Sequence, residues 1–407
     1  MKVLYVTGAC LSKNTSANMS HNGYVQGLAE SGAQVEVIMS NDSWGETDQV
    51  LRRIENVKYN EFNSVSFKDK IRKQGRQVIA VQSTAGSSQS GAQPVKKSLK
   101  SKARSFMKQM FYRLFPNDPV YPLNAKWLKT ASKFKSEEQY DLIISNSSPA
   151  ASHKLVLNLL SKKSVRTKKW IQIWEDPWYY DLYGGHTEAE RKEEELLLKA
   201  ADAVYYVSPL TLMYQKRYFP ECADKMNFIP LPAFRFTESA SPKHVQPVFG
   251  YFGDYYSHVR NLAPFINVAK KNQIQAYIIG DSNLNESSSD TVLIKPRMTL
   301  KELSEYQDNT DVLVQLCNLS GGQIPGKIYH YSVTDRKILF ILDGTDEEKK
   351  MIHQFFDQYN RYCFCENNEN DISEAIRALI NEIGKTEQEV TDFYPVNIVK
   401  KMISENV

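Results

Sequence analysis

Short apolar runs of strand length alternate with longer segments of helical period along most of the chain. Near its start, residues 2–7 form an apolar run that ends at Gly8, residues 19–30 have helical periodicity, and residues 34–39 form a second apolar run. The strands of a parallel sheet are buried on both faces, and a crossover of a dozen or more residues must join them. This stretch therefore predicts a β-α-β unit in a parallel sheet.

The same alternation repeats to the end of the chain. Further strands are predicted at 142–145, 170–174, 203–208, 248–253, 276–281, 292–298, 311–317 and 336–343, and helices at 188–201, 262–271, 300–309 and 371–382. The polar stretch 237–247 separates two halves that both open with a strand, and 407 residues are too many for one core. We predict an α/β protein with Rossmann-like, doubly wound parallel-sheet domains at residues 1–240 and 245–385.

Composition excludes several classes of protein. Hydrophobic residues make up 42% and charged residues 24%, as in ordinary globular proteins. No apolar run approaches the roughly 18 residues of a membrane span, and the first run is too short for a signal peptide, so we expect a cytoplasmic protein. The 5 scattered cysteines suit reduced thiols without metal-ligand spacing, and a net charge of +4 is too small to imply nucleic acid.

The most informative stretch follows the apolar run at 311–317. Two adjacent glycines, Gly321 and Gly322, precede a Gly-Lys pair that opens an apolar-periodic segment at Lys327. Glycines let a backbone approach a ligand closely, and the first amides of a helix lack partners within the helix. We therefore predict an anion-binding loop with free amides and the positive charge of Lys327.

The spacing from Gly321 to Lys327 also matches a phosphate-binding loop of nucleotide triphosphatases up to its last position. Ile328 stands where a Ser or Thr must bind Mg²⁺, and Pro325 lacks an amide that the phosphate needs. Nor does the chain contain Asp-x-Asp, His-x-x-x-His or Gly-x-Ser-x-Gly. A triphosphatase, a metal-dependent transferase and a serine hydrolase are all disfavoured.

A family resemblance gives a different interpretation of this loop. Residues 325–331, Pro-Gly-Lys-Ile-Tyr-His-Tyr, followed by Lys-Ile-Leu-Phe-Ile at 337–341, resemble the donor-binding block Pro-Ser-Lys-Leu-Phe-Glu-Tyr of GT-B glycosyltransferases, particularly the retaining family-4 type. His330 and Gly322 stand where that family has glutamates. A neutral His330 could accept a ribose hydroxyl, or it could merely pack within its helix. The resemblance implies donor binding by Gly321, Gly322, Gln323, Ile324, Pro325, Lys327 and His330.

A second donor block lies at the start of the second half. Residues 253–261 resemble the family block in which two cations hold the donor diphosphate. Arg260 matches the second cation, but Asp254 stands in place of the first, so Lys327 would carry more of the charge. The strand that ends near Arg297 lies where the family contacts the base. The resemblance adds Gly253, Arg260 and Arg297 to the donor site, with a plain surface role as the alternative for Arg260.

The first half resembles a bacterial branch of the same family in three blocks, at 116–127, 140–153 and 170–178. Two of them contain buried strands with polar residues at their carboxyl ends, where open α/β sheets bind ligands. Asp176 could orient the acceptor hydroxyl or stabilise positive charge at the anomeric carbon, or it could be a turn or cap residue. The resemblance implies an acceptor site made of Ser147, His153, Glu175 and Asp176, in which Glu175 replaces the usual arginine. Gly8 is assigned to the same acceptor side because it lies at the carboxyl end of the first strand, with a plain surface loop after it as the alternative.

Residues 96–115 are basic and contain no Asp or Glu, and apolar residues recur on one helical face. Such a helix can lie on an anionic membrane, or it can pack on the N-terminal domain with its lysines in water. The preceding small polar segment, 80–95, is expected to lack order. We therefore predict a basic amphipathic insert and peripheral contact with the inner face of the plasma membrane.

The combined expectation is a GT-B glycosyltransferase whose domains face an interdomain cleft, with a tail at 386–407 that crosses back to the first domain. Asp176, Arg260 and Lys327 form the predicted catalytic group. The enzyme would move a sugar from a nucleotide-sugar co-substrate to a glycan or polyprenyl-linked acceptor of capsule or O-antigen synthesis, with retention and without a metal or other cofactor. A catalytically silent, donor-binding subunit is the alternative. A GT-B-like epimerase is disfavoured, because it would leave the acceptor-side loops without a task.

Overall fold

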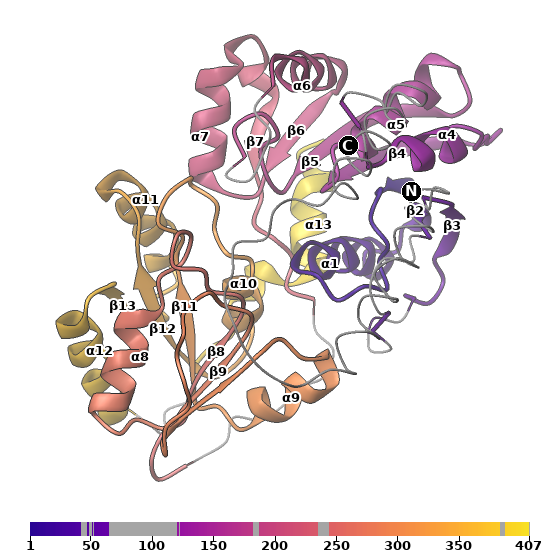
Figure 1. Ribbon diagram of the computed structural model, residues 1–407. Coiled ribbons are helices and arrows are strands. Elements are labelled where there is room, and N and C mark those ends of the chain that lie inside the picture. The colour runs from indigo at the N-terminus through magenta and orange to yellow at the C-terminus, as the bar shows by residue number, and fades with distance from the viewer. Residues whose placement is uncertain are drawn as a thin grey trace, which may run out of the picture.

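The computed structural model describes residues 1–41, 47–48, 51, 53–64, 120–121, 123–181, 187–234, 244–382 and 387–406. In these ranges the chain forms two lobes, each with its own parallel sheet (Figure 1). The predicted basic helix at 96–115, the segment 80–95 and the start of the block at 116–127 lie outside the described residues. Within the described residues, no helix is long and apolar enough to span a membrane.

The first lobe is built on a sheet with the order β3-β2-β1-β4-β5-β6-β7, in which every described pairing is parallel. Its strands are β1 (Lys2–Val6), β2 (Gln34–Ser40), β3 (Lys58–Phe62), β4 (Gln139–Ser147), β5 (Arg166–Trp174), β6 (Ala203–Tyr206) and β7 (Met226–Phe228). Its helices are α1 (Ser16–Glu30), α4 (Ala125–Ala131), α5 (Ala151–Ser161), α6 (Glu188–Ala200), α7 (Pro209–Tyr218) and the 3₁₀ turn η1 (Pro220–Lys225). The strand order reverses between β1 and β4, where sheets of this type open a crevice for ligands.

The second lobe repeats this arrangement with the order β10-β9-β8-β11-β12-β13. Its strands are β8 (Phe249–Phe252), β9 (Ala276–Ile279), β10 (Val292–Lys295), β11 (Val312–Leu316), β12 (Lys337–Leu342) and β13 (Tyr362–Glu366). Its helices are α8 (Ala263–Lys271), α9 (Leu300–Asp308), α10 (Lys327–Ser332), α11 (Asp346–Asp357) and α12 (Glu369–Asn381). The predicted α/β class with two doubly wound parallel sheets is confirmed.

Both faces of each sheet are covered, which explains why the apolar runs predicted most strands. Alternate residues of β1 point to opposite sides: Tyr5 joins a core with Tyr24 of α1, while Leu4 joins another with Leu155 of α5. The edge strand β3 is only partly buried and contains Lys, Asn and Glu, so no apolar run marked it. Helices α4, α5, α7 and α11 were also missed.

The C-terminal segment belongs to neither sheet. After η2 (Thr391–Phe393), helix α13 (Pro395–Ser404) lies against α1 of the first lobe (Figure 1). A side chain at Gly27 of α1 would place its Cβ 2.2 Å from the carbonyl oxygen of Pro395, so only glycine permits this contact. The Tyr205 hydroxyl also donates to Glu405 at 2.7 Å. The end of the chain is thereby held on the first sheet.

The two lobes also touch directly next to the loop that follows β11. Ile324 and Ile328 share a buried cluster with Leu210 of α7 and Leu231. The Tyr329 hydroxyl donates to the carbonyl of Val207 at 3.3 Å. These contacts bring the predicted donor loop against the carboxyl ends of the first-lobe strands.

Candidate active site

The loop between β11 and α10 contains the two glycines of the predicted anion site. Gly321 and Gly322 have φ angles of 101° and 72°, values that glycine adopts readily and other residues rarely do. A Cβ on Gly322 would lie 2.9 Å from that of Leu210, and Ser208 donates to the Gly322 carbonyl. Gly322 therefore allows close packing of the first lobe on this loop, where the sequence suggested close approach of a ligand.

Several backbone amides of this loop already have partners. The Gly321 amide donates to Glu348 at 2.8 Å, and Glu348 also accepts from the amide of Thr345 at the start of α11. The amides of Ile328 and Tyr329 donate to carbonyls three residues earlier, at Pro325 and Gly326. The prediction of free first-turn amides is wrong at these positions, because a tight turn and a capping carboxylate satisfy them. Positive charge at this site must come mainly from side chains.

Three cationic side chains gather near the end of β8. Lys327 lies alongside Gly253, where a Cβ would be 3.8 Å from Lys327 Cε. Burial and the charges of Arg297 and Arg260 together lower the pKa of Lys327 to about 8, while Asp254 opposes them. Electrostatic coupling of this kind requires the three cations to be near neighbours. The structure thus brings Gly253, Arg260, Arg297 and Lys327 of the predicted donor site together.

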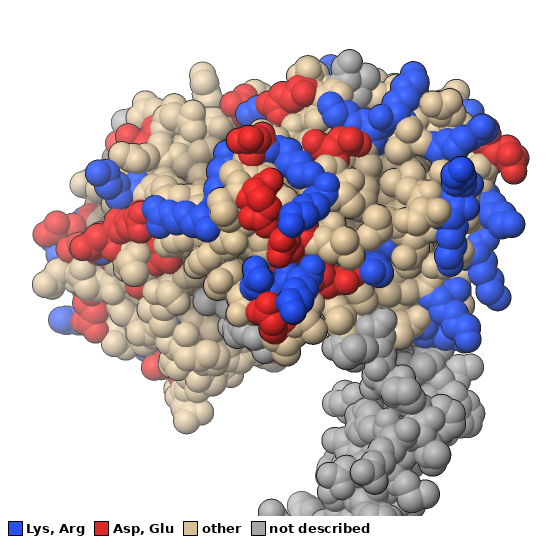
Figure 2. Space-filling model, turned by 90° about the horizontal axis from the view of Figure 1, so that it is seen from above, with Lys and Arg blue, Asp and Glu red and all other residues tan. Residues whose placement is uncertain are grey.

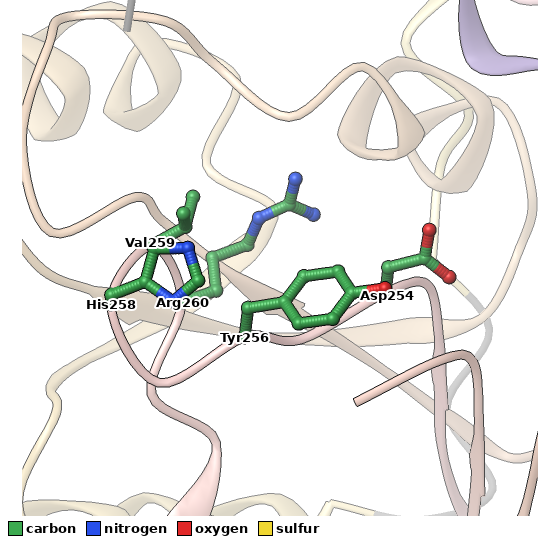
Figure 3. Close-up of a pocket in the computed structure, with 5 residues that line it drawn as sticks. All are labelled: Asp254, Tyr256, His258, Val259 and Arg260. Atoms are coloured by element: carbon green, nitrogen blue, oxygen red, sulfur yellow. The ribbon is translucent and has the colours of Figure 1, made fainter. Parts of the chain in front are cut away.

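A pocket of about 380 Å³ opens beside these cations, and its volume is in the range of small-molecule sites. Its lining comprises Asp254, Tyr256, His258, Val259 and Arg260. Figure 3 shows the guanidinium of Arg260 and the carboxylate of Asp254 on the same side of the Tyr256 ring. The Nε atom of Arg260 is buried without a hydrogen-bond partner among the described residues. A buried guanidinium N–H of this kind is suited to an incoming anion.

The tautomer of His330 follows from its surroundings. Burial lowers its pKa to about 4, with a further contribution from Lys327, so the ring is neutral at pH 7. Nδ1 lies 3.1 Å from the carbonyl oxygen of Phe234, which can only accept a hydrogen bond. Nδ1 therefore carries the proton, and Nε2 is left as an acceptor. His330 packs against its neighbours and can also accept a hydrogen bond from a hydroxyl.

The tips of the two lobes meet at Asp176. Gln323 of the second lobe donates through Nε2 to Asp176 Oδ1 at 2.6 Å and to Asp181 Oδ1 at 3.0 Å. Burial raises the pKa of Asp176 to about 6, with a further rise from Asp181, and the Gln323 hydrogen bond partly offsets both. The loop that carries Lys327 consequently faces the carboxyl end of β5, as the transferase hypothesis requires.

Glu175, the neighbour of Asp176, points beneath the tip of the sheet. Its Oε1 lies 3.9 Å from Nε2 of His21 and 3.4 Å from the side-chain amide of Asn146. Asn146 also donates to the Tyr5 hydroxyl at 2.8 Å. Burial raises the pKa of Glu175 well above its usual value and lowers that of His21 to about 3. Burial therefore disfavours the charged form of both groups in this polar cluster.

Three other predicted acceptor residues lie inside the first lobe. His153 is 0% exposed, stacks 4.2 Å from Trp174 and lies 2.8 Å from the Ser145 hydroxyl. Ser147 is buried at the end of β4. A Cβ on Gly8 would lie only 2.7 Å from a Pro149 ring atom, so this glycine lets the loop after β1 pack on the loop after β4. Their surroundings are those of core residues, and their contact with an acceptor stays a prediction.

Glu194 of α6 supports the segment after Asp176, and sequence reasoning missed it. It is 0% exposed and accepts hydrogen bonds from the amides of Tyr179, at 2.7 Å, and Trp178, at 3.4 Å. Burial raises its pKa to about 7, against the effect of these two amides. A glutamate on the apolar face of α6, three residues before Leu197, was the available signal. Asp181 had no comparable signal in the sequence.

Within the part of the chain that the structure describes, no group of three or more His, Cys, Asp or Glu side chains is arranged to hold a metal ion. Gln323 of the second lobe contacts the carboxylate pair of the first, Asp176 and Asp181, while the three cations gather at the end of β8. Two doubly wound lobes that face each other in this way define the GT-B fold.

Comparison with solved structures supports this assignment of the fold. A glycosyltransferase from Rickettsia africae ESF-5 has a TM-score of 0.53 and 11% identity, over 99% of this chain and 97% of that chain. TarM has a TM-score of 0.53 and 10% identity, over 98% and 94%. A protein described as UDP-N-acetylglucosamine 2-epimerase, from Listeria monocytogenes, has a TM-score of 0.50 and 8% identity, over 99% and 95%. No protein-family model and no curated protein matches the sequence. The predicted GT-B fold is confirmed, and these identities say nothing of the substrate.

Proposed function

We propose that the protein is a glycosyltransferase that moves a sugar from a nucleoside-diphosphate sugar to a hydroxyl of a glycan or lipid-linked oligosaccharide. The observation that carries the proposal is the contact of Gln323 with Asp176 and Asp181 across the cleft. It places the carboxylate pair of the first lobe against the loop that leads from β11 to the cation Lys327. Transfer of a sugar from a diphosphate needs both, since negative charge develops on one side of the anomeric carbon while a hydroxyl approaches.

On the donor side, Arg260 and Lys327 would bind the diphosphate. When the bond between the anomeric carbon and the phosphate oxygen breaks, its electron pair stays on the leaving phosphate. Charge-assisted hydrogen bonds from Arg260 and Lys327 stabilise that charge. An adjacent phosphate also favours the protonated form of Lys327, whose pKa is about 8 without a ligand. Nε2 of His330 would accept a hydrogen bond from a ribose hydroxyl.

On the acceptor side, Asp176 would orient the attacking hydroxyl and stabilise positive charge at the anomeric carbon. With a pKa of about 6 it is mostly ionised at pH 7. Following the family resemblance, we propose retention: the acceptor oxygen bonds to the anomeric carbon on the face that the phosphate leaves, and the hydroxyl proton passes to the phosphate. Gln323 must release Asp176 when the substrates enter, and its amide can then bind a sugar hydroxyl.

We also propose that the acceptor belongs to a bacterial surface polysaccharide and that the enzyme works at an anionic membrane. The resemblance of residues 140–153 and 170–178 to a bacterial branch supports the first point. Figure 2 shows lysine and arginine side chains along the edge on the right, the side on which Figure 1 places α4 and α5. Exposed lysines here include Lys126 and Lys129 of α4, and Lys162 and Lys163 directly after α5. Such an edge would supplement the basic insert at 96–115.

The test is to incubate the purified protein with UDP-, GDP-, ADP-, CMP- and dTDP-sugars and to measure nucleotide release and sugar products. Release of the nucleotide with free or transferred sugar supports the transferase, and NMR of the product gives the anomeric configuration. Because Gly322 and His330 replace two family glutamates, a silent donor-binding subunit is the second candidate. Binding without turnover would favour it, an epimerised nucleotide sugar would indicate an epimerase, and no binding at all would contradict the proposal.

A further inference from the structure

Asp254, which stands where the resemblance expected a cation, holds an arginine from another strand. Arg297 follows β10, and its Nη2 donates to Asp254 Oδ2 while its Nε lies 3.4 Å from Oδ1. The same Oδ1 accepts from the amide of Asp281 at 3.0 Å, and Asp281 accepts from the amide of Arg297 at 3.2 Å. Two carboxylates and two backbone amides thus fix the position of this guanidinium at the end of β8.

The guanidinium of Arg297 belongs to the same positive site as the two predicted diphosphate cations. Its charge lowers the pKa of Lys327, as does that of Arg260, and its partner Asp254 lines the pocket together with Arg260. The Arg297 side chain is 51% exposed. A guanidinium has five N–H donors, of which Asp254 engages those of Nε and Nη2, so Nη1 can bind a second anion.

We propose that Arg297 supplies the missing first cation for the donor diphosphate and that Asp254 is the positioning residue that holds it. The inference rests on the proposed function, since its ligand is the diphosphate of a nucleotide sugar. A cation at position 254 would have entered the site from the loop after β8. In this chain a carboxylate at that position brings in an arginine from the loop after β10. The phosphate site then has Arg260, Arg297 and Lys327 around it.

The test measures equilibrium binding of UDP, GDP, ADP and dTDP, with the matching nucleosides, to the full-length protein by titration calorimetry. Arg297→Ala is expected to weaken diphosphate binding about tenfold or more, because it removes a charge-assisted hydrogen bond. Nucleoside binding should change less than twofold. Arg297→Lys should give an intermediate loss, because it keeps the charge without the planar fork. Arg191→Ala, on the exposed face of α6, is the matched control.

A double variant separates direct contact from simple charge neutralisation. If Arg297 only neutralised Asp254, removing both side chains in Asp254→Ala/Arg297→Ala would restore wild-type affinity, and the inference would be overturned. Direct contact predicts that the double variant stays about tenfold weaker. Melting temperatures confirm that each variant is folded. If the wild type binds no nucleoside diphosphate, the proposed function fails. If the wild type binds one and Arg297→Ala binds it equally well, only this inference fails.

Discussion

The two tips that meet at the cleft use polar side chains in different ways. The second lobe presents Lys327 at the start of α10 and Arg260 on the lining of a pocket, and the charge of Arg260 lowers the pKa of Lys327. The first lobe places His153 and Glu175 inside, where burial lowers the pKa of His153 to about 3 and raises that of Glu175, which disfavours the charged form of each. Keeping a buried group neutral avoids the cost of an isolated charge in a medium of low dielectric.

This difference separates the residues that can take part in catalysis from those that stabilise the fold. The Ser145 hydroxyl accepts from Trp170 Nε1 at 2.8 Å and lies 2.8 Å from His153 Nδ1, and the His153 ring packs on that of Trp174, so these contacts hold the strand ends rigid. Asp176 extends from that rigid platform to the second lobe. We expect substitutions on the donor side and at Asp176 to change catalysis, and substitutions beneath Asp176 to change mainly stability.

The largest effect is expected for Lys327→Ala. Loss of a preorganised donor to developing negative charge should lower kcat/KM for the nucleotide sugar about 100-fold to 1,000-fold. In the wild type, donor binding should weaken as the pH rises through about 8, since the lowered pKa of Lys327 removes its charge there. Rates of nucleotide release from pH 6 to 9 test both points. If Lys327→Ala kept the wild-type kcat/KM, the charge of Lys327 would have no part in catalysis, and the second lobe would not differ from the first in this respect.

A loss of about 100-fold in transfer rate is expected for Asp176→Asn, with nucleoside diphosphate affinity unchanged. Because the pKa of Asp176 is about 6, its carboxylate forms as the pH rises through that value, and wild-type activity should rise with it. The variant should lack this limb of the pH profile. Steady-state kinetics from pH 4.5 to 8 make the measurement. A variant that keeps the limb would assign the titration to another group.

A smaller effect, a rise of about tenfold in the KM for the donor, is expected for His330→Phe, which removes the hydrogen-bond acceptor at Nε2. His330→Gln keeps an acceptor and serves as the control, with an expected loss of about twofold. Because the pKa of His330 is about 4, neither variant should alter the pH dependence of donor binding above pH 5.5. Equal losses in both variants would show that His330 acts only by packing.

The smallest effect on catalysis, and a clear effect on stability, is expected for Glu194→Gln. The folded pKa of Glu194 is raised to about 7 from 4.5, so its stabilising contribution is complete below pH 4.5 and is lost as the pH rises through 7. Relative to Glu194→Gln, the wild type should lose on the order of 3 kcal/mol of unfolding free energy from pH 4.5 to 8. Urea unfolding of both proteins measures the difference. Parallel pH curves would contradict the assigned pKa.

Much of the fold could be predicted, because most strands are covered on both faces and so appear as apolar runs. The edge strand β3 was not predicted, since its half-exposed positions tolerate polar residues and no apolar run marks it. In the site, Lys327, Arg260 and Asp176 were found through motifs. The partner of Asp254 was not, since Arg297 lies 43 residues further along the chain. Nor could the motif show that Glu348 would bond to the Gly321 amide.

The sequence by itself determined two parallel α/β lobes, a glycine turn after β11 and a cation at position 327. Local period, glycine conformation and charge are properties of short stretches, so they can be found without knowing the fold. The tertiary structure alone decided that Gln323 faces Asp176, that Arg297 pairs with Asp254 and that His153 is buried. These depend on the way separate strands bring their ends together, and burial then sets which of those side chains carry charge.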